Sequence, residues 1–277
     1  MRIPLAELHP FPNHPFHVRD DEAMQNTVDS IKEYGVLTPG IVRPREDGGY
    51  EVVAGHRRKH GSELAGLSDM PCIVREMDDD TATILMVDSN IQREDILPSE
   101  RAQAYKIKME ALKRQGARSD LTSPQVASKF RADDEVAKAA GISGDTVRRF
   151  VRLTELQPEL QQMVDEKKIA MTPAVELSYL KPEEQQMLLT AIDSEQATPS
   201  LSQAQRMKKL SQAGKLNDDT MLDIMMEQKK PEKCELTFSG DVLRKYFPRS
   251  YTPQRMQETI IKLLEAWVKK RQRDQER

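Results

Sequence analysis

The sequence predicts an α+β fold built from consecutive parts, and three observations support this expectation. Up to about residue 96, short runs of β-forming residues alternate with amphipathic helical runs. Residues 97–191 are patterned as helices throughout, and residues 233–277 combine one strand-like run with one amphipathic helix. We therefore expect an N-terminal α+β domain at 1–96, an all-α domain at 97–191, a polar helical or partly disordered connector at 192–232, and a small C-terminal strand-plus-helix element at 233–277.

The composition excludes several classes of protein. The 277 residues carry 42 basic and 45 acidic side chains, so the chain is no general polycation, although residues 233–277 hold 11 basic against 6 acidic side chains. A local basic face is sufficient for binding DNA. Cys72 and Cys234 lie far apart without metal-ligand spacing, which argues against a disulfide framework or a zinc site. Without a signal peptide or an apolar run that could span a bilayer, we expect a cytoplasmic protein that is associated with DNA and not with membranes.

The N-terminal domain has clear helix starts and turns. Residues 3–19 are rich in proline and histidine, which predicts an extended lid or loop. Asp20 or Asp21 can cap a helix that Gly35 ends, and the Asp-Gly-Gly of residues 47–49 predicts a hairpin between two strands. These signals predict a compact α+β unit ending near residue 88.

A cationic strand-to-helix junction is the most specific feature of this domain. Gly55 follows a strand-like run at residues 50–53, and a helix begins directly after it. Free backbone N–H groups and the positive end of the helix dipole point outward at such a junction. Arg57, Arg58 and Lys59 add three cations within one turn. We interpret the junction as an anion site, most naturally for phosphate, while a solvated basic helix start is the simpler alternative.

A second polar segment follows the next predicted strand and helix. It reads Ser89-Asn90-Ile91-Gln92-Arg93 and continues to Leu97-Pro98-Ser99-Glu100. One strand and one helix separate it from the junction, so the two segments can meet on one side of a small sheet. Pro98 stands at the favoured first position of a long helix that we expect to end near Gln115.

The all-α domain contains a helix-turn-helix pattern. Gly141 lies between helices expected at 133–140 and 146–153, and alanines in the first helix permit a close crossing. Either Ser143 or Asp145 can cap the second helix. The residues expected to face DNA are Lys138, Ser143, Thr146, Arg148, Arg149 and Arg152. An ordinary helical hairpin with a solvated basic face is the alternative.

The C-terminal element carries an apolar stripe that is too large for one isolated helix to bury. Its members are Met256, Ile260, Leu263, Leu264 and Trp267. The stripe must pack on the strand expected at residues 234–238, on another domain, or on a second copy of the chain. We expect a homodimer contact here.

Two of these motifs together resemble the ParB family of DNA-partition proteins. Gly-x-Arg-Arg follows a strand at residues 55–58, and Asn-x-Gln-Arg leads on to Leu-x-Pro-x-Glu within residues 90–100. The resemblance runs from about Ile3 to about Leu180. It implies a DNA-binding protein for plasmid or chromosome partition, which recognises a centromere-like site through its helix-turn-helix.

The resemblance also implies a nucleotide switch. In this family the N-terminal domain binds CTP with magnesium, closes two subunits into a sliding clamp on DNA, and hydrolyses CTP slowly. The implied nucleotide-binding residues are Gly55, His56, Arg57, Arg58, Asn90, Gln92 and Arg93. Asn90 is the candidate magnesium ligand, and no catalytic residue is implied.

Several departures from the family pattern bear on these expectations. The family usually has glutamate where His56 and Ser89 stand, so any CTPase activity is expected to be weak or absent. The family's Gln-Pro-Arg-Lys pattern is replaced by residues 14–17, His-Pro-Phe-His. The sequence opens directly on residues 3–5, whereas the family's basic tail precedes the first motif, which leaves stimulation of a ParA-type ATPase open. The departures favour an accessory ParB protein of a plasmid or integrative element.

Two alternatives without a nucleotide switch remain. One is a DNA-binding transcriptional regulator, and the other is a ParB-like nuclease. A nuclease needs clustered carboxylates for metal ions, and residues 78–80 are three consecutive aspartates. Adjacent residues on a helix point in different directions, so a solvated helix cap explains these aspartates better.

Overall fold

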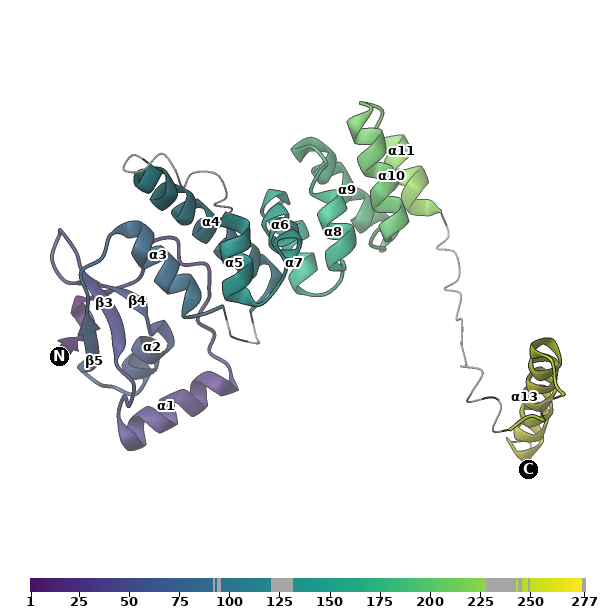
Figure 1. Ribbon diagram of the computed structural model, residues 1–277, viewed down its shortest axis with the longest axis horizontal. Helices are drawn as coiled ribbons and strands as arrows, with labels where there is room; N and C mark the ends of the chain where they lie inside the picture. Colours follow the sequence, from purple (N-terminus) through teal and green to yellow (C-terminus); the bar gives the residue numbers. More distant parts are fainter. Residues whose placement is uncertain are drawn as a thin grey trace. The chain divides into compact units, whose positions relative to one another are not determined.

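The computed structural model describes residues 1–91, 93, 96–120, 132–227, 243, 246–248 and 250–275, and the chain divides into two units at residues 1–227 and 228–277. The first unit begins with a small sheet flanked by helices and continues as a series of helices (Figure 1). The predicted α+β class is therefore confirmed. No helix in the described ranges has both the length and the apolar character needed to cross a membrane.

A five-stranded mixed sheet forms the first part of this unit, with the strand order β1-β5-β3-β4-β2. The strands are β1 (Arg2–Pro4), β2 (Leu8–His9), β3 (Gly40–Pro44), β4 (Tyr50–Ala54) and β5 (Asp69–Val74). The central strand β3 pairs antiparallel with β4 and parallel with β5. The extended segment predicted at 3–19 therefore includes two strands, β1 and β2, that its proline-rich pattern did not indicate. They form because β5 and β4 offer pairing edges from elsewhere in the chain.

Local caps define the helices around the sheet, which are α1 (Glu22–Tyr34), α2 (His56–Leu64) and α3 (Asp79–Asp88). The Asp21 carboxylate accepts a hydrogen bond from the Met24 amide at 2.8 Å, and Gly35 ends α1 with φ of 72°. The Asp78 side chain caps α3 in the same way. These predicted starts and ends are confirmed because the hydrogen bonds that create them lie within a few residues.

The remaining helices of the first unit are α4 (Pro98–Asp120), α5 (Ala132–Ala140), α6 (Gly144–Arg152), α7 (Pro158–Asp165), α8 (Met171–Leu177), α9 (Pro182–Glu195), α10 (Leu201–Gln212) and α11 (Asp218–Met226), with short 3₁₀ turns η1 (Leu5–Glu7) and η2 (Leu153–Glu155). The expected end of α4 near Gln115 is wrong, because the helix continues through Gly116 to Asp120. One glycine costs only about 1 kcal/mol in a helix, which the flanking turns offset. The helix expected at 125–130 lies outside the described residues.

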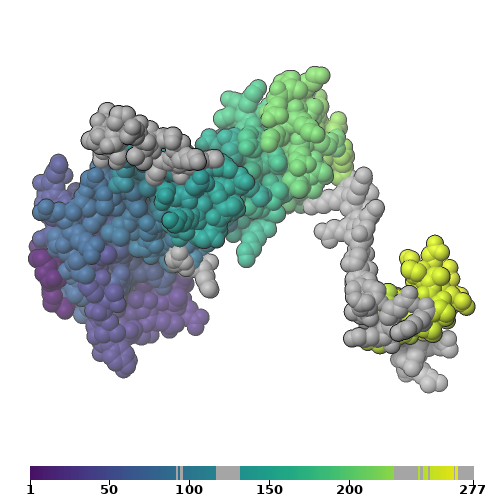
Figure 2. Space-filling model, in the orientation of Figure 1, coloured from purple at the N-terminus to yellow at the C-terminus, as the bar shows by residue number. Residues whose placement is uncertain are grey.

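The expected connector at 192–232 also differs from the structure. Within it, α10 and α11 are helices, each with its own cap, at Ser200 and Asn217. Met207 and Met221 are fully buried in one apolar cluster with Leu177 and Leu188. Figure 2 shows α7 to α11, teal to green, as one continuous surface. The polar composition of this stretch concealed a helix pair whose few apolar residues all face inward.

The sheet and the first helices of the all-α part share a second apolar cluster. It includes Val53 of β4, Met86 of α3, Tyr105 of α4 and Val147 of α6. Because α4 packs on both α3 and α6, the sheet and the helix-turn-helix are joined through one core and not through a linker. The domain boundary near residue 96 remains a prediction at the level of sequence.

The second unit contains α13 (Pro253–Gln275). Met256 is buried within this unit, whereas Leu263, Leu264 and Trp267 are more than half exposed. The strand expected at 234–238 lies outside the described residues. The apolar stripe is thus present on a helix, and its role in dimerisation stays a prediction.

Candidate functional site

The cationic junction has the geometry that its sequence predicted. Gly55 joins β4 to α2 with φ of 111°, a left-handed conformation that favours glycine. A Cβ at this position would lie 3.2 Å from both Arg58 Nη2 and the Gly40 Cα, so the backbone also leaves little room for a side chain. The first amide groups of α2 therefore stay accessible at a tight turn, as a phosphate site requires.

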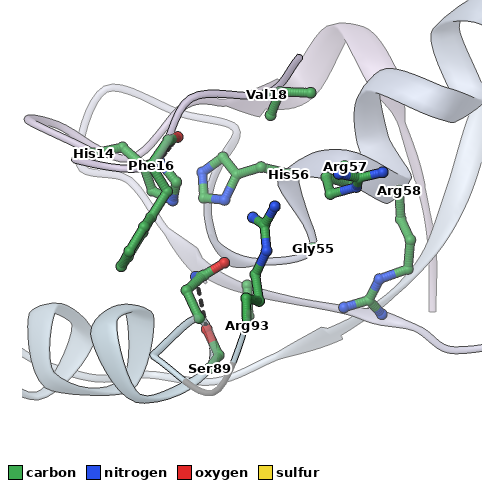
Figure 3. A pocket seen from close by; sticks show the side chains of 11 residues that line it. His14, Phe16, Val18, Gly55, His56, Arg57, Arg58, Ser89 and Arg93 are labelled. Atoms are coloured by element: carbon green, nitrogen blue, oxygen red, sulfur yellow. Dashed lines mark hydrogen bonds between the residues drawn. The ribbon is translucent and has the colours of Figure 1, made fainter. Parts of the chain in front are cut away.

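A pocket opens at this junction, and three separate segments line it. His14, Phe16 and Val18 come from the loop after β2, and residues 54–58 come from the junction. Ser89, Asn90 and Arg93 come from the end of α3 and the turn that follows (Figure 3). The structure therefore brings the two sequence motifs together at one place, although Gln92 lies outside the described residues.

Two neutral histidines lie against each other in this pocket. The rings of His14 and His56 have centroids 3.9 Å apart. Burial, followed by the positive neighbours His14 and Lys59, lowers the pKa of His56 to about 3. Burial also lowers the pKa of His14, whose Nδ1 donates to the Phe16 carbonyl at 2.7 Å. Neither Nε2 atom has a hydrogen-bond partner within the described part of the chain, and both atoms are buried.

The arginines of the pocket differ in what they contact. Arg58 donates to the backbone carbonyls of Thr38 and Pro39 at 2.7 and 2.6 Å, and it points away from His56 (Figure 3). Burial lowers the pKa of the Arg58 guanidinium. Arg57 lies 3.8 Å from an Asp21 carboxylate oxygen, too far for a strong ion pair. Arg58 thus holds the chain before β3, whereas Arg57 and Arg93 are the guanidiniums available to a ligand by position.

The lining does not fit a magnesium ion held by the protein. In the described part of the lining, Ser89 and Asn90 are the side chains with oxygen atoms, and there is no carboxylate. The Asn90 amide nitrogen donates to the Met86 carbonyl and to the Ser89 hydroxyl. Nucleotide sites usually hold magnesium with one or two carboxylates in addition to the phosphates. No group of three or more candidate metal ligands occurs elsewhere among the described residues either.

The roof of the pocket is attached to α4. The His17 amide and its Nδ1 both lie within 3.1 Å of one oxygen of Glu100, and this carboxylate is almost fully buried. Glu100 also accepts from the Leu97 amide at the start of α4. Sequence reasoning missed the three roof residues His14, Phe16 and Val18 as site residues. The available signal was the alignment of residues 14–17 with the family's Gln-Pro-Arg-Lys pattern.

The helix-turn-helix forms as predicted, from α5 and α6. Gly141 turns the chain with φ of 68°, and the Ser143 hydroxyl caps α6 by accepting from the Thr146 amide. Val147 is fully buried beneath the second helix. The pair packs on α4, where Arg101 lies over the Phe150 ring at 5.6 Å. Lys138 is exposed on α5, and Thr146 is half-buried beside the cap.

The three arginines of α6 have different neighbours. Arg148 forms ion pairs with Asp133 and Asp145, which together raise the pKa of its guanidinium. Arg149 is exposed and donates to the Thr172 hydroxyl at 2.9 Å. Arg152 lies 4.2 Å over the Tyr179 ring and donates to the Ser178 carbonyl, so it connects α6 to the end of α8. Sequence reasoning treated all three as equally outward-facing, which the structure corrects for Arg152 because its guanidinium has intramolecular partners.

The three aspartates at residues 78–80 have separate structural roles. Asp78 caps α3, Asp79 pairs with Arg43, and Asp80 is buried against Arg114 of α4. Their side chains point to three different partners, as expected for neighbours on a helix. They do not form a shared metal-binding cluster.

Comparison with known proteins places these features in a family. Residues 1–91 match the ParB N-terminal domain and residues 94–212 match the ParB HTH domain. The chain is 35% identical over 184 residues to the chromosome-partitioning protein Spo0J of Thermus thermophilus, covering 66% of this chain and 61% of that protein. The chain thus spans roughly three fifths of the length of this relative.

Two solved structures of the C-terminally truncated ParB from Caulobacter crescentus are also similar. The one complexed to the centromeric parS site has 25% identity and a TM-score of 0.47, covering 76% of this chain and 98% of that chain. The one complexed with CTP-gamma-S has 30% identity and a TM-score of 0.32, covering 64% of this chain and 91% of that chain. Because the two domain models together match well over half of its residues, the chain belongs to the ParB family.

Proposed function

We propose that this protein is a partition factor that binds a centromere-like DNA site through α5 and α6 and binds CTP in the pocket at Gly55. The observation that carries the nucleotide part is the meeting of two sequence motifs in one pocket. The junction at residues 54–58 and the segment containing Ser89, Asn90 and Arg93 are far apart in sequence and line the same cavity. Arg57 and Arg93 supply positive charge there, and α2 supplies amide groups.

The base identity comes from relatives and not from the pocket itself. A ParB related to this chain has been solved with CTP-gamma-S, and another structure of it contains the parS site. For this chain, CTP and a parS-like site are therefore the first ligands to test. We infer further that two subunits close on DNA as a clamp, which the exposed apolar residues of α13 support as a dimer contact.

The decisive experiment is calorimetry of the full chain with CTP, ATP and GTP, each with and without a DNA containing parS-like sequences. We expect saturable binding of CTP that is at least about tenfold tighter than that of the two purines. Silence with all three nucleotides, together with sequence-specific DNA binding, would instead identify a DNA-binding regulator without a nucleotide switch.

Turnover is expected to be slow or absent. Among the described residues that line the pocket there is no carboxylate to activate a water molecule. The nearby aspartates at 78–80 are engaged in capping and ion pairs, which also speaks against the nuclease alternative.

The dimer contact has its own test. Deleting residues 233–277 should lower the dimer fraction in analytical ultracentrifugation without nucleotide. A truncated chain that stays fully dimeric would place the contact in the first unit. ParA-type partner stimulation is a separate proposal, to be tested by adding the protein to such an ATPase with DNA.

A further inference from the structure

The charge of the pocket at Gly55 is one-sided, and the inference drawn from it rests on the proposed role of the pocket as a nucleotide site. The described lining contains the guanidinium groups of Arg57, Arg58 and Arg93, and it contains no carboxylate. A divalent cation is needed at many phosphate sites because it bridges an anionic wall and an anionic ligand. Here the wall has no anion to be bridged, within the residues that the structure describes.

His56 offers a direct hydrogen bond in place of such a bridge. It is the first residue of α2, and its buried Nε2 has no partner in the described part of the molecule. Its strongly lowered pKa keeps the ring neutral near neutral pH. A neutral imidazole can carry its proton on Nε2 and donate it. Leaving a buried polar atom unpaired costs about 1–3 kcal/mol, which a ligand oxygen at this position would recover.

Other donors lie beside it. The Ser89 hydroxyl and the Asn90 amide nitrogen come from the opposite wall of the same pocket, where they now bond to the Met86 carbonyl. Arg93 extends toward His56 in Figure 3. The pocket is therefore surrounded by N–H and O–H groups from α2, from the end of α3 and from Arg93, which is the donor set of an oxyanion site.

We propose that this pocket binds the phosphates of its nucleotide directly, without a bridging divalent cation, and that His56 Nε2 is one of the hydrogen-bond donors. Arg57 and Arg93 balance the phosphate charge that magnesium balances in carboxylate-lined sites. The same lining explains slow turnover, because a site that holds the phosphates through donors alone has no general base for an attacking water.

Calorimetry of the full chain with CTP tests the proposal, at about pH 7 and constant ionic strength, with either magnesium or EDTA present. We expect the dissociation constants under the two conditions to agree within about threefold. A value in EDTA that is more than about tenfold weaker would overturn the proposal while leaving the nucleotide function intact. Absence of binding under both conditions would refute the nucleotide function as well.

Two substitutions at one position separate the role of His56 from its packing. His56→Gln keeps a neutral donor and should retain metal-independent binding within about threefold. His56→Glu places a carboxylate against the phosphates, so it should bind at least about tenfold more weakly in EDTA and recover when magnesium is added. Thermal unfolding of both variants shows that they are folded. If His56→Glu binds as well as the wild type in EDTA, His56 does not face the phosphates.

Discussion

The junction helix α2 and the recognition helix α6 each carry two consecutive arginines, and tertiary structure divides each pair differently. In α2, Arg58 is engaged with backbone carbonyls while Arg57 lies by the pocket. In α6, Arg148 is held by two carboxylates while Arg149 is exposed. Arginines that are equivalent in sequence thus take unlike roles, because one member of each pair neutralises or orients the fold and the other is left for a ligand.

The two helices also differ in the sign of their surroundings. The described lining around α2 contains no carboxylate, whereas α6 is flanked by Asp133 and Asp145. A pocket for a compact triphosphate benefits from undiluted positive charge. A surface that must release incorrect DNA sequences benefits from carboxylates that weaken nonspecific attraction. The difference between these environments leads to four predictions.

The largest effect is expected in α2. Arg57→Ala should weaken CTP binding at least about tenfold, because charge-assisted hydrogen bonds are each worth about 1.5–3 kcal/mol. The matched control is Arg58→Ala, which should also lower the thermal unfolding midpoint, since Arg58 holds the Thr38 and Pro39 carbonyls. Calorimetry and thermal unfolding separate the two outcomes. Equal CTP affinity of Arg57→Ala and wild type would remove Arg57 from the site.

In α6, Arg149→Ala should reduce affinity for the specific DNA site by about 1–3 kcal/mol, as expected for a residue that reads a base. Arg148→Ala should have a smaller effect, because its guanidinium is already paired with Asp133 and Asp145. Fluorescence anisotropy with specific and scrambled DNA measures both. If Arg148→Ala costs more than Arg149→Ala, the ion pairs must open on DNA and Arg148 is the reader.

The buried histidine of the junction should make stability depend on pH. The pKa of His56 is lowered in the folded state, so the unfolded state binds the proton more tightly. Its stabilising contribution is therefore complete above the ordinary histidine pKa and is lost as the pH falls toward 3. Between about pH 7 and pH 5 the loss should reach about 2 kcal/mol. Urea unfolding measures this change, and in His56→Gln the corresponding pH slope should be absent; an identical slope would assign it to other groups.

The smallest effect is expected from Asp145, which is exposed next to Arg148. Asp145→Asn should tighten DNA binding by about two- to threefold at low salt, because it removes a negative charge and releases one partner of Arg148. The gain should shrink as salt is raised, since exposed charges are screened. Anisotropy titrations at two salt concentrations check this, and an unchanged affinity at low salt would mean that Asp145 lies away from the DNA.

The sequence by itself determined the local features of this protein. Asp21 and Ser143 cap their helices, and Gly55 and Gly141 turn the chain at positive φ, each as predicted. These features follow from one side chain and the few backbone groups next to it, so spacing along the chain is enough to find them. The two ParB motifs were recognisable for the same reason, because their residues are consecutive.

Only the tertiary structure decided which of those residues remain available to a ligand. His14 meets His56, Arg58 reaches the segment before β3, and Glu100 holds the roof of the pocket at His17. Each of these contacts joins segments whose separation along the chain says nothing about their distance in space. Burial then sets the charge of His56 and the partners of Arg58, because the cost of desolvating an ionised group depends on what the fold packs around it.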